Sequence, residues 1–479
     1  MKVSAMIVFP VFFPILAGLL LLCGKEPKRF KSLVLYMGIG LGITTIGIWN
    51  VVIGQDISYT LFNLTAHLPV YFRVDMVGKL FMSLVSLVWI AAGLFSFSYM
   101  RKKRERRRFF GFYLMAYGVL AGLGFAGNLI TFYLFYEMMT LLTLPLVLHD
   151  RTKEAIMAGL KYLLYSLCGA YMVLFGLYVI YRYANTLSFT PKGVLDMAFM
   201  MLAGFSVKAG CFPMHGWLPS AHPVAPAPAS AVMSGIIVKV GILGVIRTIF
   251  YLFGVDFLRG TWVQATVLAL SLITVFLGSM LAFLEKGFKK RLAYSTVSQV
   301  SYILFGLLLL TPDGLKGAFF QVLFHALVKS CLFLCAGAMM NKTGRHQVKE
   351  LGGIGKEMPL TLWCYTLCAL TLIGIPPTGG FMSKWYLCTG ALKSLLTVFS
   401  WLGPVTLLVS ALLTAGYLLP LTVRGFFPGE EKVAQKTEKK EAGWIMLLPI
   451  IVLTAVALLL GIFPERLAGL FSGLAGQLM

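Results

Sequence analysis

Long apolar stretches recur along the chain, and they constrain its fold more than any other feature. About 20 apolar residues span the ~30 Å hydrocarbon core of a bilayer as a helix. With 59% hydrophobic and 12% charged residues, a soluble core could not absorb this sequence without exposing large apolar patches. Fourteen stretches have the required length, near 4–23, 32–54, 76–100, 109–127, 128–148, 157–181, 197–217, 229–253, 262–284, 293–311, 317–340, 358–392 (interrupted), 401–423 and 443–463.

The predicted fold is an all-α polytopic membrane protein with about 14 transmembrane helices, because an open sheet in lipid leaves backbone groups unpaired. We expect two inverted five-helix repeats, made of spans 4–8 and spans 9–13. The predicted segments are 1–108 (spans 1–3 and a basic loop), 109–253 (first repeat), 262–423 (second repeat) and 424–479 (a cytoplasmic loop and span 14).

Spans 7 and 12 are interrupted by proline and glycine. Pro213 and four further prolines follow Lys208 in GFSVKAGCFPMHGWLPSAHPVAPAPAS, and Pro376 and Pro377 precede Lys384 in LIGIPPTGGFMSKWYL. Proline removes a backbone donor, and non-helical backbone at membrane depth is tolerated only against protein or a wet cavity. Broken helices at corresponding places are typical of transporter repeats. Kinks that serve packing alone are the alternative.

The formal net charge of +23 would suggest nucleic acid as the partner of a soluble protein. Sorted by the predicted loops, however, 26 of the 41 Lys and Arg residues fall on one face and nine on the other. Basic loops face the cytoplasm, so we expect both termini outside a prokaryotic cytoplasmic (inner) membrane, and no nucleic-acid partner. The run RKKRERRR at 101–108 is interpreted as a topology anchor, with anionic lipid or a partner subunit as alternative roles.

Six basic residues and one acid remain within the predicted spans. A charge at a helix centre costs roughly 2.5–3.5 kcal/mol on insertion scales, so such residues are candidates for function. Those near span ends can extend their charged groups toward water. Glu137 is the only acid in mid-span, and a Glu–Lys pair that forms and breaks is a proton switch. A static buried ion pair is the alternative. The basic residues are Lys161 and Arg247, near span ends, and Lys208, Lys239, Lys329 and Lys384.

Histidines extend this set of candidate residues. His325 and Lys329 are four apart, on one helix face. His215 lies seven residues after Lys208 and seven before His222, so both histidines are possible relay groups. A core histidine hydrogen-bonded to backbone is the alternative. The sequence contains no CxxC, Walker A, HExxH or GxSxG pattern, so we expect no catalytic centre, metal or cofactor.

Several long motifs resemble those of the proton-translocating, antiporter-like membrane subunits. This family includes large subunits of Mrp-type cation/proton antiporters and their counterparts in complex I and membrane-bound hydrogenases. The resemblance covers nearly the whole chain and is most specific over 128–392. Its motifs are FYEMMTL, VKAGCFPMHGWLPSAHPVAPAPASA, SGIIVKVGILGVIR, KRLAYSTVSQVSYI, FHALVKSCLFLCAGA and GIPPTGGFMSKWYL.

The resemblance implies roles for the buried charges. Glu137 and Lys208 look like the family's ion pair between spans 5 and 7. Lys239 looks like the central relay lysine, with His325 and Lys329 continuing the path. Lys384 looks like the terminal lysine that exchanges protons with the outside; some members carry Glu there, whereas Lys resembles the Mrp D-type subunit.

We therefore expect a subunit that moves protons, with Na⁺ as a further candidate ion, in a complex with other membrane subunits. Two sources of energy for this proton movement are possible. One is a secondary antiporter driven by an ion gradient, and the other is the pump module of a redox complex such as a hydrogenase or a complex I-like enzyme. A third interpretation, a passive channel or solute transporter, predicts that Lys208→Ala leaves transport intact.

Overall fold

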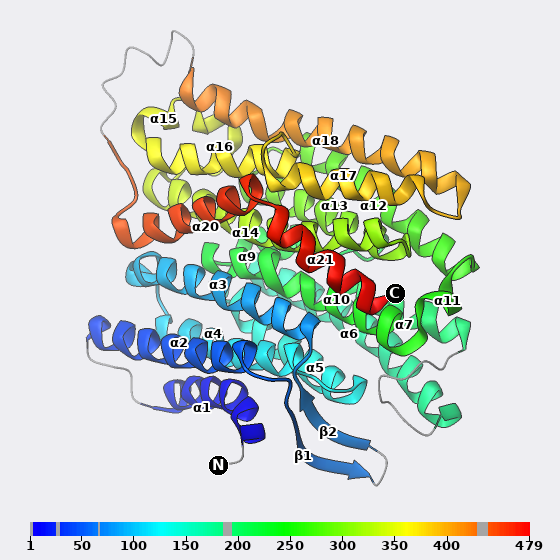
Figure 1. Cartoon of the computed structure of the whole chain (residues 1–479). Helices are drawn as coiled ribbons and strands as arrows, with labels where there is room; N and C mark the ends of the chain where they lie inside the picture. Colours follow the sequence, from blue (N-terminus) through cyan, green and yellow to red (C-terminus); the bar gives the residue numbers. More distant parts are fainter. Residues whose placement is uncertain (1–2, 25–28, 66–67, 185–193, 429–438) are drawn as a thin grey trace.

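Helices account for most of the structure (Figure 1), a computed structural model that describes residues 3–24, 29–65, 68–184, 194–428 and 439–479. Ten helices within these ranges are long and apolar enough to cross a membrane. The polytopic helical fold is thus confirmed, while the count of 14 spans stays a prediction. Six basic residues used for the topology lie outside the described residues: Lys2, Lys25, Lys28, Lys192, Lys432 and Lys436.

A two-stranded antiparallel hairpin interrupts the N-terminal helices, which the all-α expectation did not include. Its strands pair Ser58 with Arg73 and Thr65 with Leu68. The hairpin lies between two predicted spans, where water can satisfy a sheet edge. Its second strand packs on the α4–α5 turn, where Arg73 N–H donates to Phe125 O (2.8 Å). The elements are η1 (Val3–Val8), α1 (Phe9–Cys23), α2 (Phe30–Ile53), β1 (Ser58–Thr65), β2 (Leu68–Arg73), α3 (Met76–Tyr99) and η2 (Met100–Lys102).

The seventh span is divided, as predicted from its prolines. Its first helix ends at Gly210, whose φ of +81° favours glycine, and residues 211–217 form turns before the next helix begins. Lys208, His215 and His222 therefore do not share one helix face. The elements are α4 (Arg106–Gly124), α5 (Leu129–Val147), α6 (Lys153–Ala184), α7 (Leu195–Ala209), α8 (Leu218–Val224), α9 (Ala227–Val232), the π-helical η3 (Met233–Ile237), α10 (Val238–Ile246), the π-helical η4 (Arg247–Phe253) and α11 (Val255–Leu258).

The twelfth span is divided at residues 374–378, which separate α16 from α17. A final amphipathic helix, α21, was not predicted; it packs against α14, with Phe471 and Leu474 buried. The elements are α12 (Trp262–Leu284), α13 (Phe288–Leu308), α14 (Pro312–Thr343), η5 (Val348–Leu351), α15 (Ile354–Glu357), α16 (Pro359–Ile373), α17 (Gly379–Leu392), α18 (Thr397–Phe426), α20 (Trp444–Ile462) and α21 (Glu465–Leu478).

Helix α14 lies in the middle of the bundle (Figure 1), packed against α13, α16, α17 and α20 as well as α3 and α9. In its most apolar window 94% of the residues are buried, against 33% in α2 and α18. The outer helices instead expose large apolar side chains such as Trp401 and Leu412. A soluble protein rarely exposes such a surface, so lipid or other membrane subunits must cover it.

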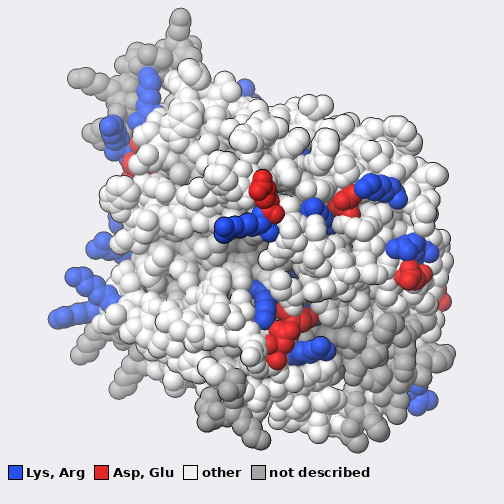
Figure 2. Space-filling view, in the orientation of Figure 1, with Lys and Arg blue, Asp and Glu red and all other residues white. Residues whose placement is uncertain are grey.

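Projecting basic side chains mark one end of the bundle. Figure 2 shows Lys and Arg projecting from the edge where α15 and the start of α20 lie in Figure 1. The basic run after α3, including exposed Arg101 and Arg104, belongs to the same end. This arrangement agrees with the basic face predicted from the loops.

Candidate functional site

Lys208 lies in the last turn of α7, where the helix stops at the break in span 7. Its side chain is fully buried. The Nζ atom donates to three hydroxyl groups: Thr140 Oγ1 (2.9 Å), Tyr162 OH (2.8 Å) and Ser166 Oγ (3.2 Å). The carbonyl end of a helix also stabilises a cation. Hydroxyl groups and a helix terminus therefore hold this lysine inside the membrane.

Glu137, the predicted partner of Lys208, lies half-buried on α5 and accepts a hydrogen bond from Tyr133 OH (2.9 Å). Among the described residues no salt bridge joins Glu137 to Lys208, so the expected ion pair is not made in this structure. The reason is that hydroxyls use all three Nζ donors. Thr140, one turn further along α5, makes the contact in place of the carboxylate.

Lys239 and His325 meet at the centre of the bundle, from α10 and α14. Lys239 Nζ contacts His325 Nδ1 within hydrogen-bonding distance and also donates to Ser234 O (2.8 Å). Both side chains are 1% exposed. The other ring nitrogen of His325, Nε2, has no hydrogen-bond partner among the described residues. The structure thus brings together two residues that the sequence places 86 positions apart.

Lys329 follows His325 by one turn of α14 and is fully buried. Its Nζ has no hydrogen-bond partner within the part of the chain that the structure describes. His222, on α8, stacks on Phe333 with ring centroids 4.7 Å apart, and Phe333 is one turn beyond Lys329. Neither ring nitrogen of the fully buried His222 is partnered by a described residue. His325, Lys329 and Phe333 therefore follow one face of α14, and His222 packs against the end of that face.

His215 is placed differently from the other predicted histidine. It lies in the turns between α7 and α8, half-buried, with its ring stacked on Phe212 at 6.0 Å. No hydrogen bond between described residues joins it to Lys208 or His222. The structure therefore places His222, and not His215, beside the central lysines.

Lys384 lies on α17, directly after the break in span 12. Its Nζ donates to the carbonyl oxygens of Leu372 (3.0 Å) and Ile373, at the end of α16. Gly374 ends that helix with a φ of +90°, and a Cβ atom there would lie 2.9 Å from Lys384 Cδ. The ammonium group therefore caps the negative end of one half-helix from the start of the next.

A buried hydrogen-bonded chain joins α13, α14 and α17, the last two of which carry His325 and Lys384. Gln321 Nε2 donates to Gln299 Oε1 (2.8 Å), and Ser383 Oγ donates to Gln321 Oε1 (2.7 Å). Gln321 lies one turn before His325 on α14, while Ser383 is adjacent to Lys384 on α17. Sequence reasoning missed this chain, although the spacing of four between Gln321 and His325 was a signal for it.

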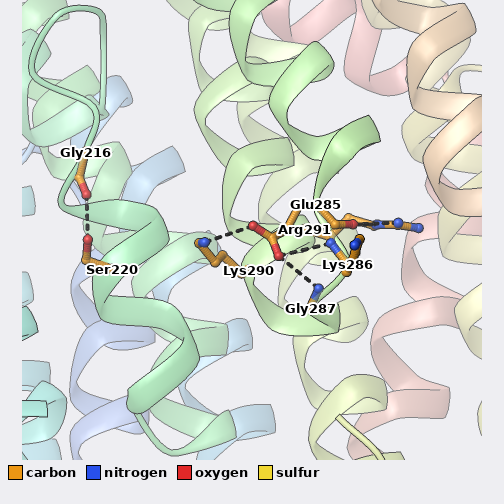
Figure 3. Close-up of polar contacts among 7 residues, drawn as sticks. All are labelled: Gly216, Ser220, Glu285, Lys286, Gly287, Lys290 and Arg291. Carbon is orange, nitrogen blue, oxygen red and sulfur yellow. Dashed lines mark hydrogen bonds and ion pairs between the residues drawn. The ribbon is translucent and has the colours of Figure 1, made fainter. Parts of the chain in front are cut away.

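Glu285 organises the loop between α12 and α13 (Figure 3). Its carboxylate accepts the N–H groups of Lys286 (3.0 Å) and Gly287 (2.9 Å) and pairs with Lys290 Nζ (2.9 Å). Its carbonyl oxygen accepts from Arg291 Nε (2.9 Å). Burial alone would raise the pKa of Glu285, but the Gly287 N–H and the Lys290 ammonium hold this pKa below its usual value. The loop is therefore fixed by an ionised carboxylate.

Lys289, in the same basic segment, turns into the protein. It is 7% exposed, and its Nζ donates to Ala225 O (2.8 Å) at the end of α8. It is one of the 26 basic residues counted on the more basic face, and the structure places it in the first turn of α13 with its side chain buried. Lys290 and Arg291 both contact Glu285. Lys289 instead points inward, toward α8, the helix that carries His222.

Arg247 does not extend toward water, as its position near a span end suggested. It is 1% exposed and forms a two-point ion pair with Asp75, with Nη2 2.9 Å from Oδ1. Asp75 Oδ1 also accepts from Gly78 N–H (2.8 Å) and so caps the start of α3. The pair ties η4 to α3, and its two parallel hydrogen bonds make it a structural contact.

A family model and individual proteins of known sequence were both found to be similar to this chain. The family described as "NADH:quinone oxidoreductase/Mrp antiporter, TM" matches residues 126–414. The N-type subunit of NADH-quinone oxidoreductase from Desulforudis audaxviator is 32% identical over 411 residues, 80% of each chain. The D-type subunit of the Na⁺/H⁺ antiporter from Alkalihalophilus pseudofirmus is 28% identical over 473 residues, 96% of this chain and 94% of that one.

The fold also agrees with a solved structure. A chain in the Mrp complex from Dietzia sp. DQ12-45-1b superposes with a TM-score of 0.86 over 100% of this chain and 98% of that one, at 23% identity. The family match spans more than half of the sequence, and the two curated relatives align along most of it. The chain therefore belongs to the transmembrane-subunit family of NADH:quinone oxidoreductases and Mrp antiporters.

Proposed function

We propose that this chain is the proton-translocating subunit of a multisubunit membrane complex, similar to the D-type subunit of Mrp antiporters. One observation carries the proposal: Lys239 contacts His325, with Lys329 one turn away, in a fully buried site that contains no carboxylate contact among the described residues. Desolvation disfavours both a charged ammonium and a charged imidazolium, so a proton is held weakly here and can pass across the Lys239–His325 contact. Such a group exchanges protons without leaving the membrane.

The proposed route begins in the first predicted repeat and ends in the second. Protons enter from the cytoplasm near Glu137 and Lys208, pass Lys239, His325 and Lys329, and leave at Lys384. The hydroxyl groups around Lys208 and the hydrogen-bonded chain Gln299–Gln321–Ser383 support the route, because they supply polar groups inside an apolar bundle. His222 is a further relay group in this proposal, since it stacks on Phe333, which lies one turn from Lys329 on α14.

Proton flux into proteoliposomes that contain the intact complex tests the route. We expect Lys239→Met to abolish proton-coupled flux, because the thioether cannot hold a proton. Lys342→Met, an exposed position near the end of α14, is the matched control and should keep the wild-type rate. Unchanged flux in Lys239→Met would refute the proposal, and unchanged flux in Lys208→Ala would favour a passive channel.

A second candidate function is the pump module of a redox complex. It is favoured by the 32% identity to a chain of an NADH-quinone oxidoreductase, which exceeds the 28% identity to a chain of an antiporter. Purification of the intact complex and identification of its subunits separate the two. Hydrogenase or NADH-oxidising subunits would indicate redox coupling, and a set of small membrane subunits alone would indicate antiport, with Na⁺ as the ion to test.

The orientation and repeat structure belong to the same proposal. Both termini would lie outside a prokaryotic inner membrane, with the basic end of the bundle in the cytoplasm. Residues 109–253 and 262–423 would form the two inverted repeats, which is supported by one broken span and one associated lysine in each, at Lys208 and Lys384. Accessibility of a single cysteine placed at Arg104, which is exposed, tests the orientation in intact cells.

A further inference from the structure

A groove of about 870 Å³ opens at the basic end of the bundle, between the start of α2, the end of α3 and the start of α20. This volume lies toward the upper end of the roughly 300–1,000 Å³ of small-molecule sites. Basic side chains line one part of it and apolar side chains the other. The lining residues are Arg29, Phe30, Lys31, Val34, Leu35, Phe97, Ser98, Arg101 and Ile445.

The polar and apolar parts are separated along the helix axes. On α2, Lys31 is followed one turn deeper by Val34 and Leu35, which share its face. Arg101, in η2 at the end of α3, is preceded one turn deeper by Phe97 of α3. Each helix thus presents a cation at the end of the bundle and an apolar side chain toward its middle. A ligand that fits has an anionic head and an apolar tail.

The cations of the groove are available for a ligand. Arg29, Lys31 and Arg101 are exposed, and none of them forms a salt bridge with a described residue. Glu441, an acid just before α20, is already bound by Leu360 N–H (2.8 Å) and Thr361 Oγ1 (2.5 Å). Uncompensated guanidinium and ammonium groups favour an anion with several oxygens, such as a phosphate.

The depth of the groove matches the headgroup region of a bilayer. Trp444, at the start of α20 and next to Ile445, is 72% exposed, as expected for an aromatic side chain at the membrane–water interface. Arg106 stacks over Phe30 at 4.9 Å and donates to Arg101 O (3.2 Å), which ties the basic loop to the groove. The cations therefore lie at the end of the apolar spans, where a bilayer has its phosphates, with Leu35 and Phe97 one turn deeper.

We propose that this groove is a binding site for an anionic phospholipid. The headgroup phosphate accepts hydrogen bonds from Arg29, Lys31 and Arg101, and an acyl chain lies along Leu35, Phe97 and Ile445. The site is separate from the proton route, because none of its residues belongs to the groups around Lys208, Lys239 or Lys384. If the groove does not bind lipid, the proposed proton-translocating function is unaffected.

Binding of matched lipids to the full-length chain tests this site. We expect phosphatidylglycerol to raise the midpoint of thermal unfolding and to stay bound in native mass spectrometry, unlike phosphatidylcholine with the same acyl chains. The triple variant Arg29→Gln/Lys31→Gln/Arg101→Gln should weaken phosphatidylglycerol binding about a hundredfold, the loss expected for three interfacial cations. Leu35→Trp, which fills the apolar part without changing charge, should displace the lipid as well.

A control variant with the same change in charge distinguishes binding in the groove from nonspecific electrostatic attraction of lipid to the basic end. Lys102→Gln/Arg104→Gln/Lys153→Gln removes three exposed cations of the same end that do not line the groove, and it should bind phosphatidylglycerol as the wild type does. Equal loss in both triple variants would overturn the proposal. So would equal stabilisation by inorganic phosphate, which indicates a free-anion site, or exclusion of lipid by another subunit in the intact complex.

Discussion

At the scale of residues, the buried charges differ in what compensates them. Lys208 has three hydroxyl partners and Lys384 has two carbonyl oxygens, whereas Lys329 has no partner among the described residues. A structural charge inside a membrane is normally paired, so Lys329 is the strongest candidate of the three for the proposed proton route. His325, which contacts Lys239 one turn before Lys329, is the residue best placed to share its proton.

We predict that His325→Gln lowers proton flux at least about tenfold, because an amide replaces a group that accepts and donates protons. The amide oxygen can still receive the Lys239 contact, so the fold should be kept, as checked by thermal unfolding. His346→Gln, on an exposed loop, is the matched control. Wild-type flux in His325→Gln would remove the imidazole from the route.

At the scale of elements, helix ends set the positions of the charged groups. The backbone N–H groups of the α12–α13 loop bind Glu285, and the last carbonyl groups of α16 bind Lys384. Sequence could predict the breaks, since proline and glycine mark them. It could not predict that α16 would present its last carbonyl groups to Lys384, because that contact depends on the angle at which α17 returns.

We predict that Gly374→Ala destabilises the protein by more than the about 1–2 kcal/mol expected for a left-handed alanine, and also lowers proton flux. The added Cβ would lie 2.9 Å from Lys384 Cδ and move the ammonium group. Gly344→Ala is the control for strain alone, since Gly344 has a φ of +70° with nothing within 4 Å of the added Cβ. Equal effects of both substitutions on unfolding and flux would contradict the role of the close approach.

We predict that Glu285→Gln lowers the thermal unfolding midpoint at neutral pH but not in acid. The pKa of Glu285 is lowered in the folded state, so its contribution is present above the unfolded pKa of about 4.3 and is lost as pH falls through the folded pKa. Asp256→Asn is the control, because this carboxylate is 91% exposed in its pair with Arg259 and should matter little at any pH. A difference that does not shrink as the pH falls below the unfolded pKa of about 4.3 would contradict the ionised cap.

At the scale of the whole molecule, the outer surface carries exposed apolar side chains beside a membrane-embedded acid. Glu137 lies on a face of α5 whose neighbours Leu134, Met138 and Leu141 are 36%, 37% and 58% exposed. A carboxylate that faced lipid in mid-span would cost roughly 2.5–3.5 kcal/mol. Another membrane subunit, which the family's complexes provide, is the more favourable cover for this face.

We predict that Leu141→Cys is protected from a lipid-soluble thiol reagent in the intact complex and becomes reactive when the chain is isolated. Leu412→Cys, on α18, is 73% exposed as leucine and serves as the control for a surface that faces lipid. Mass spectrometry of the labelled peptides measures both sites. Equal labelling of the two positions in the complex would show that α5 faces lipid instead.

The sequence by itself determined the membrane fold, the positions of the two broken spans and which charged residues lie within the spans. Hydropathy, proline and charge act within one helix, so they can be read without knowing which helices pack together. Tertiary structure decided which charges meet: Lys239 with His325, Lys208 with hydroxyls and not Glu137, Arg247 with Asp75, and Lys289 turned inward. These contacts join helices far apart in the chain, and only their packing angles and rotations bring the side chains within hydrogen-bonding distance.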